Sequence, residues 1–391
     1  MAATSVIARR RVLQVITAFS SDAPAQSAAV LAKYLDRDRF DVRAVSLRPV
    51  SGHASTAAAD LAAAGIPHMS LGMRGFGDLT AVWRLWRLLG TWRPDIVHSH
   101  AFRADVWCGI TGRLAGVPLV VCTIRNHDTE ILRAEHPGLI GRVAARLSRI
   151  STRLSHRVIA VSDGVAEYLV TAHGVPRDKV SVVRNGFDFA RLADDVGDRA
   201  AVRARMGWRD DEIVIGTLAI LKARKGLSYL VEAARAVVDA HPAARFFIAG
   251  DGPDRPMLEA EIERLGLDGR VMLLGHRSDP LALLHASDIY ALPSLFEGLP
   301  RSLLEAMALG KPVVVTDIGG SREVVAHEES GFVVPPRDAA RLARALSALV
   351  ASAELRLAFG RAGRLVIEAQ FDARGTAAAH ERIYNRDLPA T

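Results

Sequence analysis

Two glutamates eight residues apart, Glu297 and Glu305, are the strongest candidates for chemistry in this chain. The segment between them contains Gly298 and Pro300, which predict a tight loop entering a helix, because proline in the first turn of a helix sacrifices no hydrogen bond. Gly310 predicts the end of that helix. One carboxylate is therefore expected on a loop and the other on the helix that follows it.

The start of this helix predicts an anion-binding site. The free amides of Arg301 to Leu303 lie at the positive end of the helix dipole, where phosphate groups commonly bind. Glu305 would lie ~6 Å further along the axis, at ~1.5 Å per residue, within reach of the hydroxyls of a ribose. Glu297 would bind hydroxyls of a sugar on the other side of the phosphates. For this spacing taken alone, the alternative is an ordinary surface helix with one paired glutamate.

Residues 287–336 supply a more specific pattern. They contain Ser287-Asp288-Ile289-Tyr290-Ala291-Leu292-Pro293-Ser294, the two-glutamate segment, Thr316-Asp317-Ile318-Gly319-Gly320-Ser321-Arg322-Glu323, and Ser330-Gly331-Phe332-Val333-Val334-Pro335-Pro336. This passage resembles, nearly position by position, the donor domain of the retaining glycosyltransferase family 4 (group 1 glycosyl transferases), which has a GT-B fold. The resemblance implies transfer of a sugar from a UDP- or GDP-sugar to a hydroxyl acceptor, in the biosynthesis of polysaccharide, lipid-linked glycan or another glycoconjugate. It also implies retention of anomeric configuration, no obligatory metal and no cofactor, since the nucleotide-sugar is a substrate.

Weaker matches extend the resemblance along most of the chain. Gly250-Asp251-Gly252-Pro253 and Leu274-Gly275-His276-Arg277 are similar to the family's loops beside the nucleoside, and Asn185-Gly186-Phe187-Asp188 is similar to its interdomain turn. The resemblance assigns catalysis to Glu297 and Lys225, and His127 is a third catalytic candidate by its proximity to a family position. It assigns the acceptor side to His98, His100 and Arg125; the two histidines could instead line the cleft or satisfy a buried hydrogen bond. It assigns donor binding to Glu305, Gly298, Leu299, Pro300, Arg301, Ser302, Leu303, Gly216, Gly226, Gly250, Asp251, Gly252, Gly275, His276 and Arg277.

The chain departs from the family pattern at three places. In Gly216-Thr217-Leu218-Ala219-Ile220-Leu221-Lys222-Ala223-Arg224-Lys225-Gly226, isoleucine 220 stands where the family often has an arginine beside the diphosphate. Either Lys225 with the helix dipole, or Lys222 or Arg224, must then neutralise the leaving phosphate. Residues 20–27 lack the family's Gly-Gly loop, and Arg125 stands where many members have a histidine, which makes His127 a candidate by proximity. A catalytically weak partner subunit of another transferase, and a nucleotide-sugar epimerase of the same fold, are the alternative functions.

The elements that must position these residues are βαβ units. Short β-branched runs at 12–17, 41–47, 95–98, 119–124 and 158–161 alternate with amphipathic stretches, and the rhythm starts again at 213–218. We expect an α/β protein with two facing Rossmann-like domains of parallel strands, with a ligand cleft between them at the carboxyl ends of the strands. The predicted divisions are an acceptor-binding domain at 1–188, a donor-binding domain at 189–370 and a helix at 371–391 that packs back on the first domain, with the linker near 188–200.

Composition limits the setting of the protein. The chain has 391 residues with only two cysteines, no signal-type segment at its N-terminus and no apolar run of membrane-spanning length, so a cytoplasmic protein is expected. Residues 1–190 hold 24 Lys/Arg against 15 Asp/Glu. The basic amphipathic helix expected at 141–157 could contact the inner face of the cell membrane peripherally, which favours a lipid-linked or otherwise anionic acceptor and no nucleic acid. A helix packed on its own core with arginines in water is the alternative.

Three further patterns carry little weight as cofactor or metal sites. Gly250-x-Gly252 lacks the third glycine of a dinucleotide-binding loop. Asp36-x-Asp38 has the spacing of metal-dependent transferases but lies in a charged turn. His98 and His100 share one face of a strand end without a further ligand cluster, so no metal is expected.

Overall fold

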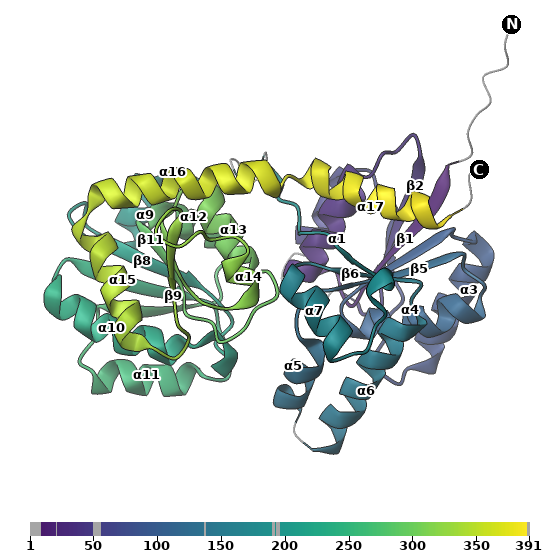
Figure 1. The fold of residues 1–391 in the computed structure, drawn as a ribbon, viewed down its shortest axis with the longest axis horizontal. Helices are drawn as coiled ribbons and strands as arrows, with labels where there is room; N and C mark the ends of the chain where they lie inside the picture. Colours follow the sequence, from purple (N-terminus) through teal and green to yellow (C-terminus); the bar gives the residue numbers. More distant parts are fainter. Residues whose placement is uncertain are drawn as a thin grey trace, which may run out of the picture. The chain divides into compact units, whose positions relative to one another are not determined.

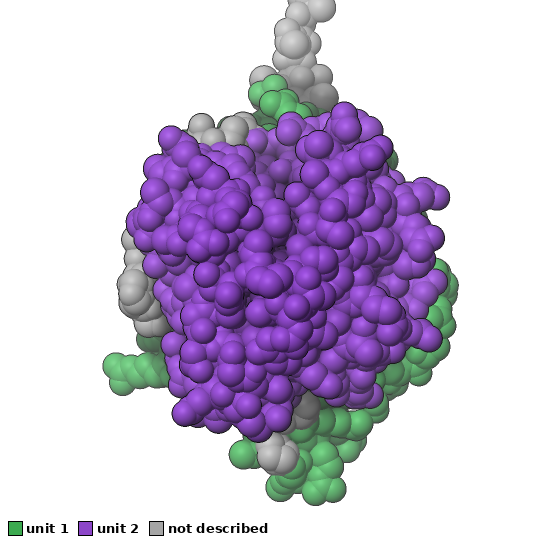
Figure 2. Space-filling view, turned by 90° about the vertical axis from the view of Figure 1, so that its left-hand side faces the viewer, with its two compact units in different colours: residues 1–187, 373–391 green, residues 188–372 purple. Residues whose placement is uncertain are grey.

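The computed structural model describes residues 9–388 except 21, 50–55, 137, 190–191 and 193–195. The extreme N-terminus and part of the predicted linker at 188–200 therefore lie outside the described residues. The chain divides into two compact units (Figure 2): unit 1 comprises residues 1–187 and 373–391, and unit 2 comprises residues 188–372. Each unit is an α/β body with its own sheet. The cleft expected between two domains stays a prediction.

Unit 1 contains a seven-stranded parallel sheet with the order β3-β2-β1-β4-β5-β6-β7 (Figure 1). Its strands are β1 (Arg10–Ile16), β2 (Phe40–Ser46), β3 (His68–Ser70), β4 (Ile96–His100), β5 (Leu119–Ile124), β6 (Arg157–Ala160) and β7 (Val180–Val182). Its helices are α1 (Ala23–Tyr34), α2 (Thr56–Ala63), α3 (Leu79–Trp92), α4 (Phe102–Leu114), α5 (Asp128–Glu135), α6 (Leu139–Leu154), α7 (Asp163–Thr171) and α17 (Ala373–Asp387), with a 3₁₀ turn at Arg177–Lys179.

Alternation along the strands builds two cores, one on each face of this sheet. In β1, Val12 and Ile16 pack with α1, α2 and α17, whereas Leu13 and Val15 pack with α3 and α4 on the opposite face. This is the period-two pattern of a strand that is buried on both sides. The polar Gln14 points to the same face as Val12 and contacts α17 through Tyr384. The α1/α17 face therefore carries buried polar side chains that the α3/α4 face lacks in β1.

The C-terminal helix α17 is an integral part of unit 1. The Asp387 carboxylate accepts hydrogen bonds from Arg157 at 2.6 and 2.7 Å, and the backbone amide of Asp36 donates to Glu381 at 2.8 Å. The ring of Tyr384 is fully buried and packs edge-on against Phe40. Residues from the end of the chain thus complete a core that begins with its first strand.

Unit 2 contains a six-stranded parallel sheet with the order β10-β9-β8-β11-β12-β13. Its strands are β8 (Ile213–Leu218), β9 (Ala244–Ala249), β10 (Val271–Gly275), β11 (Ile289–Leu292), β12 (Val313–Thr316) and β13 (Gly331–Val334). Its helices are α9 (Arg199–Met206), α10 (Leu227–Ala240), α11 (Arg255–Arg264), α12 (Pro280–Ala286), α13 (Arg301–Ala308), α14 (Gly319–Arg322), α15 (Ala339–Ala351) and α16 (Ala353–Gln370), with a 3₁₀ turn at Ala223–Lys225.

Each sheet has one point at which the strand order reverses. In unit 1 the reversal lies between β1 and β4, and in unit 2 it lies between β8 and β11. At such a point the connections that follow the two parallel strands run to opposite sides of the sheet. In α/β proteins ligands bind at the carboxyl ends of the strands at this point. The predicted fold of two Rossmann-like sheets is confirmed. The two reversal points are the regions where a ligand-binding site is expected.

Candidate functional site

The loops at the reversal point of unit 2 meet around the predicted catalytic carboxylate, Glu297. Glu297 lies on the loop between β11 and α13, with only 6% of its side chain exposed. Lys225, on the loop after β8, donates a hydrogen bond to one carboxylate oxygen, and the Ser294 hydroxyl donates to the same oxygen at 3.0 Å. The structure therefore joins the two predicted catalytic residues of this unit into one ion pair across the reversal point.

Arg224 is a second cation at this carboxylate. Its Nη1 lies 3.6 Å from Oε2 of Glu297. The Nε and Nη1 atoms of Arg224 are buried and make no hydrogen bond within the described part of the chain. A buried guanidinium with unused N–H groups loses free energy unless a ligand binds it. By contrast, isoleucine 220, at the position of the family's arginine, has 52% of its surface exposed.

Close backbone contacts hold the loops around the ion pair. Gly226 has φ +62°, and a Cβ atom there would lie 2.2 Å from the carbonyl oxygen of Pro293. The amide of Leu295 donates to the Arg224 carbonyl at 2.8 Å, which ties the loop after β8 to the loop after β11. Gly250 has φ +140°, and a Cβ atom there would lie 1.9 Å from the Ala219 carbonyl oxygen. Glycine is required at both positions because no side chain fits.

The N-terminus of α13 lies directly after Glu297 in the chain. Pro300 is the N-cap and supplies no side-chain hydrogen bond, as expected for a helix start that can accept a ligand. The Leu303 amide donates to the Pro300 carbonyl at 3.2 Å, so the amides available to an anion are those of Arg301 and Ser302 rather than the predicted three. Tyr290 donates to the Ser302 hydroxyl oxygen at 2.6 Å, which leaves the serine proton free to be donated.

Glu305 lies on α13, one turn beyond its start. The Arg301 Nε donates to one Glu305 carboxylate oxygen at 2.7 Å, and the glutamate side chain is largely buried. This i,i+4 pair fixes the carboxylate on the helix surface. A ribose would meet a carboxylate that is already oriented.

The remaining predicted donor residues lie in three places. Gly275 is the last residue of β10, and its carbonyl accepts a hydrogen bond from the Gly250 amide at 2.8 Å. Asp251, Gly252, His276 and Arg277 lie on the loops that follow β9 and β10. Gly298 and Leu299 are buried in the loop before α13. Gly216 is different, because it lies within β8 and a Cβ atom there would lie 2.5 Å from the Phe247 ring. Packing against this ring accounts for the glycine at position 216, and its role in donor binding stays a prediction.

The strand ends at the reversal point of unit 1 carry buried histidines. His98 and His100, at the end of β4, are fully buried. One ring nitrogen of His98 lies 2.6 Å from the Tyr384 hydroxyl and the other lies 2.7 Å from the Thr123 hydroxyl, while His100 lies 2.7 Å from the Gln14 side-chain oxygen. The predicted acceptor-side histidines therefore have protein partners, which favours a structural role for His98.

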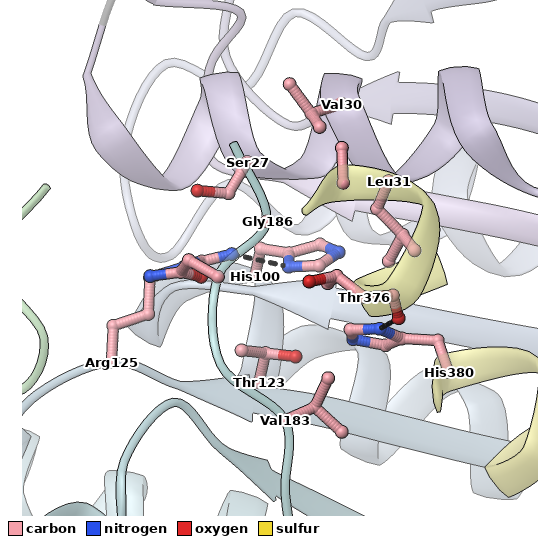
Figure 3. A pocket seen from close by; sticks show the side chains of 12 residues that line it. Ser27, Val30, Leu31, His100, Thr123, Arg125, Val183, Gly186, Thr376 and His380 are labelled. Atoms are coloured by element: carbon pink, nitrogen blue, oxygen red, sulfur yellow. Dashed lines mark hydrogen bonds between the residues drawn. The ribbon is translucent and has the colours of Figure 1, made fainter. Parts of the chain in front are cut away.

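Arg125 connects this histidine cluster to a small pocket (Figure 3). The guanidinium contacts the His100 ring at 3.2 Å and also binds the Asn185 side chain. The cavity measures ≈20 Å³, enough for about one water molecule. His380 and Thr376 of α17 line the other side. Arg125 is thus a charged group at the strand end, and the space behind it is small.

The three clustered histidines His98, His100 and His380 are held neutral. Burial lowers the pKa of His98 and of His100 well below the ordinary value, and the charge of Arg125 acts in the same direction on both. Burial also lowers the pKa of His380 to about 4. Neutral imidazoles in mutual contact can exchange hydrogen bonds but cannot neutralise a phosphate.

His127, the third predicted catalytic residue, lies at the start of α5. Its ring stacks on Tyr168 with the centroids 4.2 Å apart, and its Nδ1 lies 3.5 Å from Glu130. The Tyr168 hydroxyl accepts a hydrogen bond from the Thr129 amide at 3.1 Å. Tyr168 is a residue that the sequence did not single out, because its stacking partner lies about forty positions away in the chain.

The described residues form neither a metal-binding cluster nor a membrane-spanning helix. Among these residues, no group of three or more His, Cys, Asp or Glu side chains is arranged to hold a metal ion. None of the described helices combines the length and the apolar character that crossing a bilayer requires. Cys108 and Cys122 are buried free thiols.

Comparison with known proteins identifies the class to which this fold and site belong. Residues 198–366 match the family model of glycosyl transferases group 1, and residues 25–191 match that of glycosyltransferase family 4. The chain belongs to this family of GT-B glycosyltransferases. The predicted family is confirmed.

Individual relatives show the range of the family. The chain is 30% identical over 264 residues to UDP-Gal:alpha-D-GlcNAc-diphosphoundecaprenol alpha-1,3-galactosyltransferase of Escherichia coli, covering 67% of each protein. It is 30% identical over 305 residues to the glycogen synthase of Mycobacterium tuberculosis, covering 76% of this chain and 70% of the relative. The crystal structure of Anabaena HepE with UDP and glucose shares the fold with a TM-score of 0.81, at 24% identity, over 97% of this chain and 100% of HepE.

Proposed function

We propose that this glycosyltransferase moves a sugar from a UDP-sugar to a hydroxyl acceptor with retention of anomeric configuration, and that unit 2 binds the donor. The observation that carries the proposal is the Lys225–Glu297 ion pair beside the start of α13. Cations, helix amides and a carboxylate converge there at the reversal point of the sheet. That combination suits a ligand with a diphosphate flanked by two sets of hydroxyls.

The residues around Glu297 each bind a different part of the donor. The amides of Arg301 and Ser302, with Lys225, bind the diphosphate. Glu305 accepts hydrogen bonds from the ribose hydroxyls, and Glu297 accepts them from the hydroxyls of the transferred sugar. Because Glu297 already binds Lys225, the sugar and the diphosphate are held by one rigid cluster.

Arg224 takes the place of the arginine that the family pattern has at position 220. Its buried N–H groups without hydrogen bonds lie next to the carboxylate that orients the sugar. Negative charge grows on the leaving diphosphate as the sugar–phosphate bond breaks, and preorganised cations stabilise that charge. Arg224 and Lys225 are therefore the two diphosphate-binding cations of the proposal.

The chemistry proposed is front-face transfer. The bond between the anomeric carbon and the donor's phosphate oxygen breaks, and the nucleoside diphosphate leaves with the electron pair. The acceptor hydroxyl attacks from the same face, and its proton passes to an oxygen of the leaving phosphate. The protein supplies no nucleophile, metal or cofactor in this scheme, and its task is positioning and charge stabilisation.

The donor and acceptor classes are proposed from a relative. The Escherichia coli protein that is 30% identical to the chain uses UDP-Gal and a sugar linked to diphosphoundecaprenol, according to its name. We extend to this chain the UDP-linked donor and a lipid-linked acceptor. A setting at the inner face of the cell membrane follows from such an acceptor.

A thermal-shift screen tests the donor site first. The protein is heated with UDP, GDP, ADP and their sugar conjugates, since a ligand at ~100 times its dissociation constant adds ~2.7 kcal/mol to the free energy of unfolding. We expect UDP and one UDP-sugar to raise the melting temperature. A shift with GDP alone would contradict the choice of base, and no shift with any nucleotide would contradict the donor site. NMR of the product's anomeric centre then tests retention.

A further inference from the structure

Helix α3 exposes an apolar stripe that no other described residue of unit 1 covers. Leu79, Trp83 and Trp86 follow one another at helical spacing on the face opposite the buried Leu85 and Leu89. The tryptophans are 53% and 48% exposed, and Leu79 is 70% exposed. Single exposed apolar residues are common on protein surfaces, but a continuous stripe with two tryptophans marks an interaction site.

Helix α6 presents a stripe of the same kind. Leu139, Val143 and Ile150 are exposed on the face opposite the buried Ala145. The exposed residues Arg142, Arg146 and Arg153 flank this stripe. Long arginine side chains can lie along an apolar surface while their charged ends reach a polar layer beside it.

The two helices belong to one layer. Helix α4 contacts both α3 and α6, and in Figure 1 the three lie on the side of the sheet away from α17. We call the outer surface of α3, α4 and α6 the α3–α6 face. Within helices α3, α4 and α6 the single carboxylate is Asp105, which is fully buried, and the partly exposed Asp78 caps the start of α3. Its arginines are Arg84, Arg87, Arg103, Arg113, Arg142, Arg146, Arg149 and Arg153.

We propose that the α3–α6 face binds the surface of an anionic lipid bilayer. Arginines bind lipid phosphates, tryptophans are favoured at the boundary between headgroups and acyl chains, and exposed leucine and isoleucine side chains enter the apolar region. The surface is wider than the basic helix expected from the sequence, because the tryptophans of α3 add the anchoring groups that α6 lacks.

Charge distinguishes a bilayer from a second copy of the chain. Pairing two copies through this face would place the arginines of one copy against those of the other, with only the cap residue Asp78 at the edge of the face to offset them. A nucleic acid would satisfy the arginines but would leave the aliphatic stripe of α6 in water. An anionic bilayer satisfies both the charges and the apolar side chains.

This proposal goes beyond the proposed function and does not use the donor site. The face lies in unit 1, whereas the Lys225–Glu297 cluster lies in unit 2. Binding to vesicles can therefore be measured without nucleotide or acceptor. A failure of vesicle binding would leave the donor assignment unaffected, and a failure of donor binding would leave the membrane proposal unaffected.

The test is flotation of the full-length protein with phosphatidylcholine vesicles, with and without phosphatidylglycerol. We expect binding only to the anionic vesicles. The double variant Trp83→Ala/Trp86→Ala should lower the partition coefficient about tenfold by removing exposed aromatic area. The triple variant Arg142→Gln/Arg146→Gln/Arg153→Gln should lower it on the order of a hundredfold, since each arginine near an anionic surface contributes about one factor of five.

Helix α16 provides the matched control. Leu357 and Leu365 are 62% and 66% exposed there, so Leu357→Ala/Leu365→Ala removes apolar surface from unit 2 and should leave binding unchanged. Thermal unfolding checks that each variant folds. Three results would overturn the proposal. The tryptophan variant could bind as well as the wild type, the wild type could bind neutral and anionic vesicles equally, or it could bind neither. Binding to RNA that competes with the vesicles and survives the tryptophan substitutions would assign the face to nucleic acid instead.

Discussion

The two sheets reverse their strand order in the same way but fill the resulting crevices with opposite chemistry. In unit 1 the strand ends carry His98 and His100, which are neutral, buried and bonded to protein partners. In unit 2 the strand ends carry Arg224, Lys225 and Glu297, which are charged and only partly satisfied. Topology therefore sets where a ligand can bind, whereas the residue types at that place decide what it can be.

The cost of the unit 2 cluster supports a functional reading. Bringing two cations and a carboxylate out of water is expensive, and their attraction seldom exceeds the desolvation penalty by much. Apolar residues of similar volume would stabilise the fold as well. The charges are better explained by a ligand that completes their hydrogen bonds, and the largest predicted effects therefore concern this cluster.

The first prediction concerns the carboxylate itself. Glu297→Gln should lower kcat/KM about a thousandfold, because it removes the acceptor that orients the sugar and releases the two cations from their shared partner. Steady-state assays measure the change, with a UDP-sugar as donor and a hydroxyl acceptor that the wild-type enzyme uses. The exposed Glu328→Gln variant of the same unit is the matched control and should retain wild-type activity. Activity of the Glu297 variant within threefold of wild type would contradict the assignment.

The second prediction concerns the cation that replaces the family's arginine. Arg224→Gln should lower kcat/KM about a hundredfold, because less charge faces the leaving diphosphate. Adding Ile220→Arg to that variant places a guanidinium on the neighbouring loop position and should restore at least part of the loss. Ile220→Arg in the wild-type background should change little. If the double variant is no better than Arg224→Gln alone, the two positions do not share one role.

Much of this comparison could be anticipated from the sequence. The β-branched runs at 12–17, 119–124 and 213–218 each contain or overlap a strand, because strands buried on both faces are apolar throughout. Strand β3 was not predicted, since His68, Met69 and Ser70 are all exposed and show neither alternation nor an apolar run. Helix α13 and the loop before it could be predicted from the positions of proline and glycine, because these residues determine the backbone conformation of their own segment.

The partners of the site residues could not be anticipated in the same way. Tyr384 reaches His98 from 286 positions away in the chain, and Lys225 meets Glu297 from 72 positions away. No local pattern encodes such contacts, which depend on how helices pack on the sheet. For the same reason Gly216 was assigned to the donor, whereas its neighbour in space is the Phe247 ring. The sequence identifies candidate residues by their chemical type, whereas their function depends on which residues surround them in space.

The third prediction concerns the neutral cluster of unit 1. The pKa of His380 is about 4 in the folded protein against an ordinary 6.5, so the unfolded chain binds its proton first as the pH falls. Stability is therefore lost below about pH 6.5, by up to ~1.4 kcal/mol per pH unit for this group. His380→Asn should be less stable than wild type at pH 7.5 but should lose about 2 kcal/mol less between pH 7.5 and pH 5.

Urea unfolding monitored by tryptophan fluorescence measures this difference. Four of the five tryptophans, at positions 83, 86, 92 and 107, lie in unit 1, so the signal reports mainly on that unit. Asp105 acts with the opposite sign, because burial raises its pKa to about 7 and its contribution to stability is lost as the pH rises from about 4 to 7. The comparison of variant with wild type removes this background. Parallel pH profiles of the two proteins would show that His380 is not held neutral.

The fourth and smallest effect separates the two glutamates from which the site was first inferred. Glu305→Ala should raise the KM for the UDP-sugar about tenfold and leave kcat nearly unchanged, because a ribose contact that is equal in the ground and transition states contributes to binding only. Arg301→Ala removes the partner that orients this carboxylate and should have a weaker effect in the same direction. A fall in kcat as large as that of Glu297→Gln would place Glu305 at the reacting sugar, and the two carboxylates would then have to share one role instead of reading the two ends of the donor.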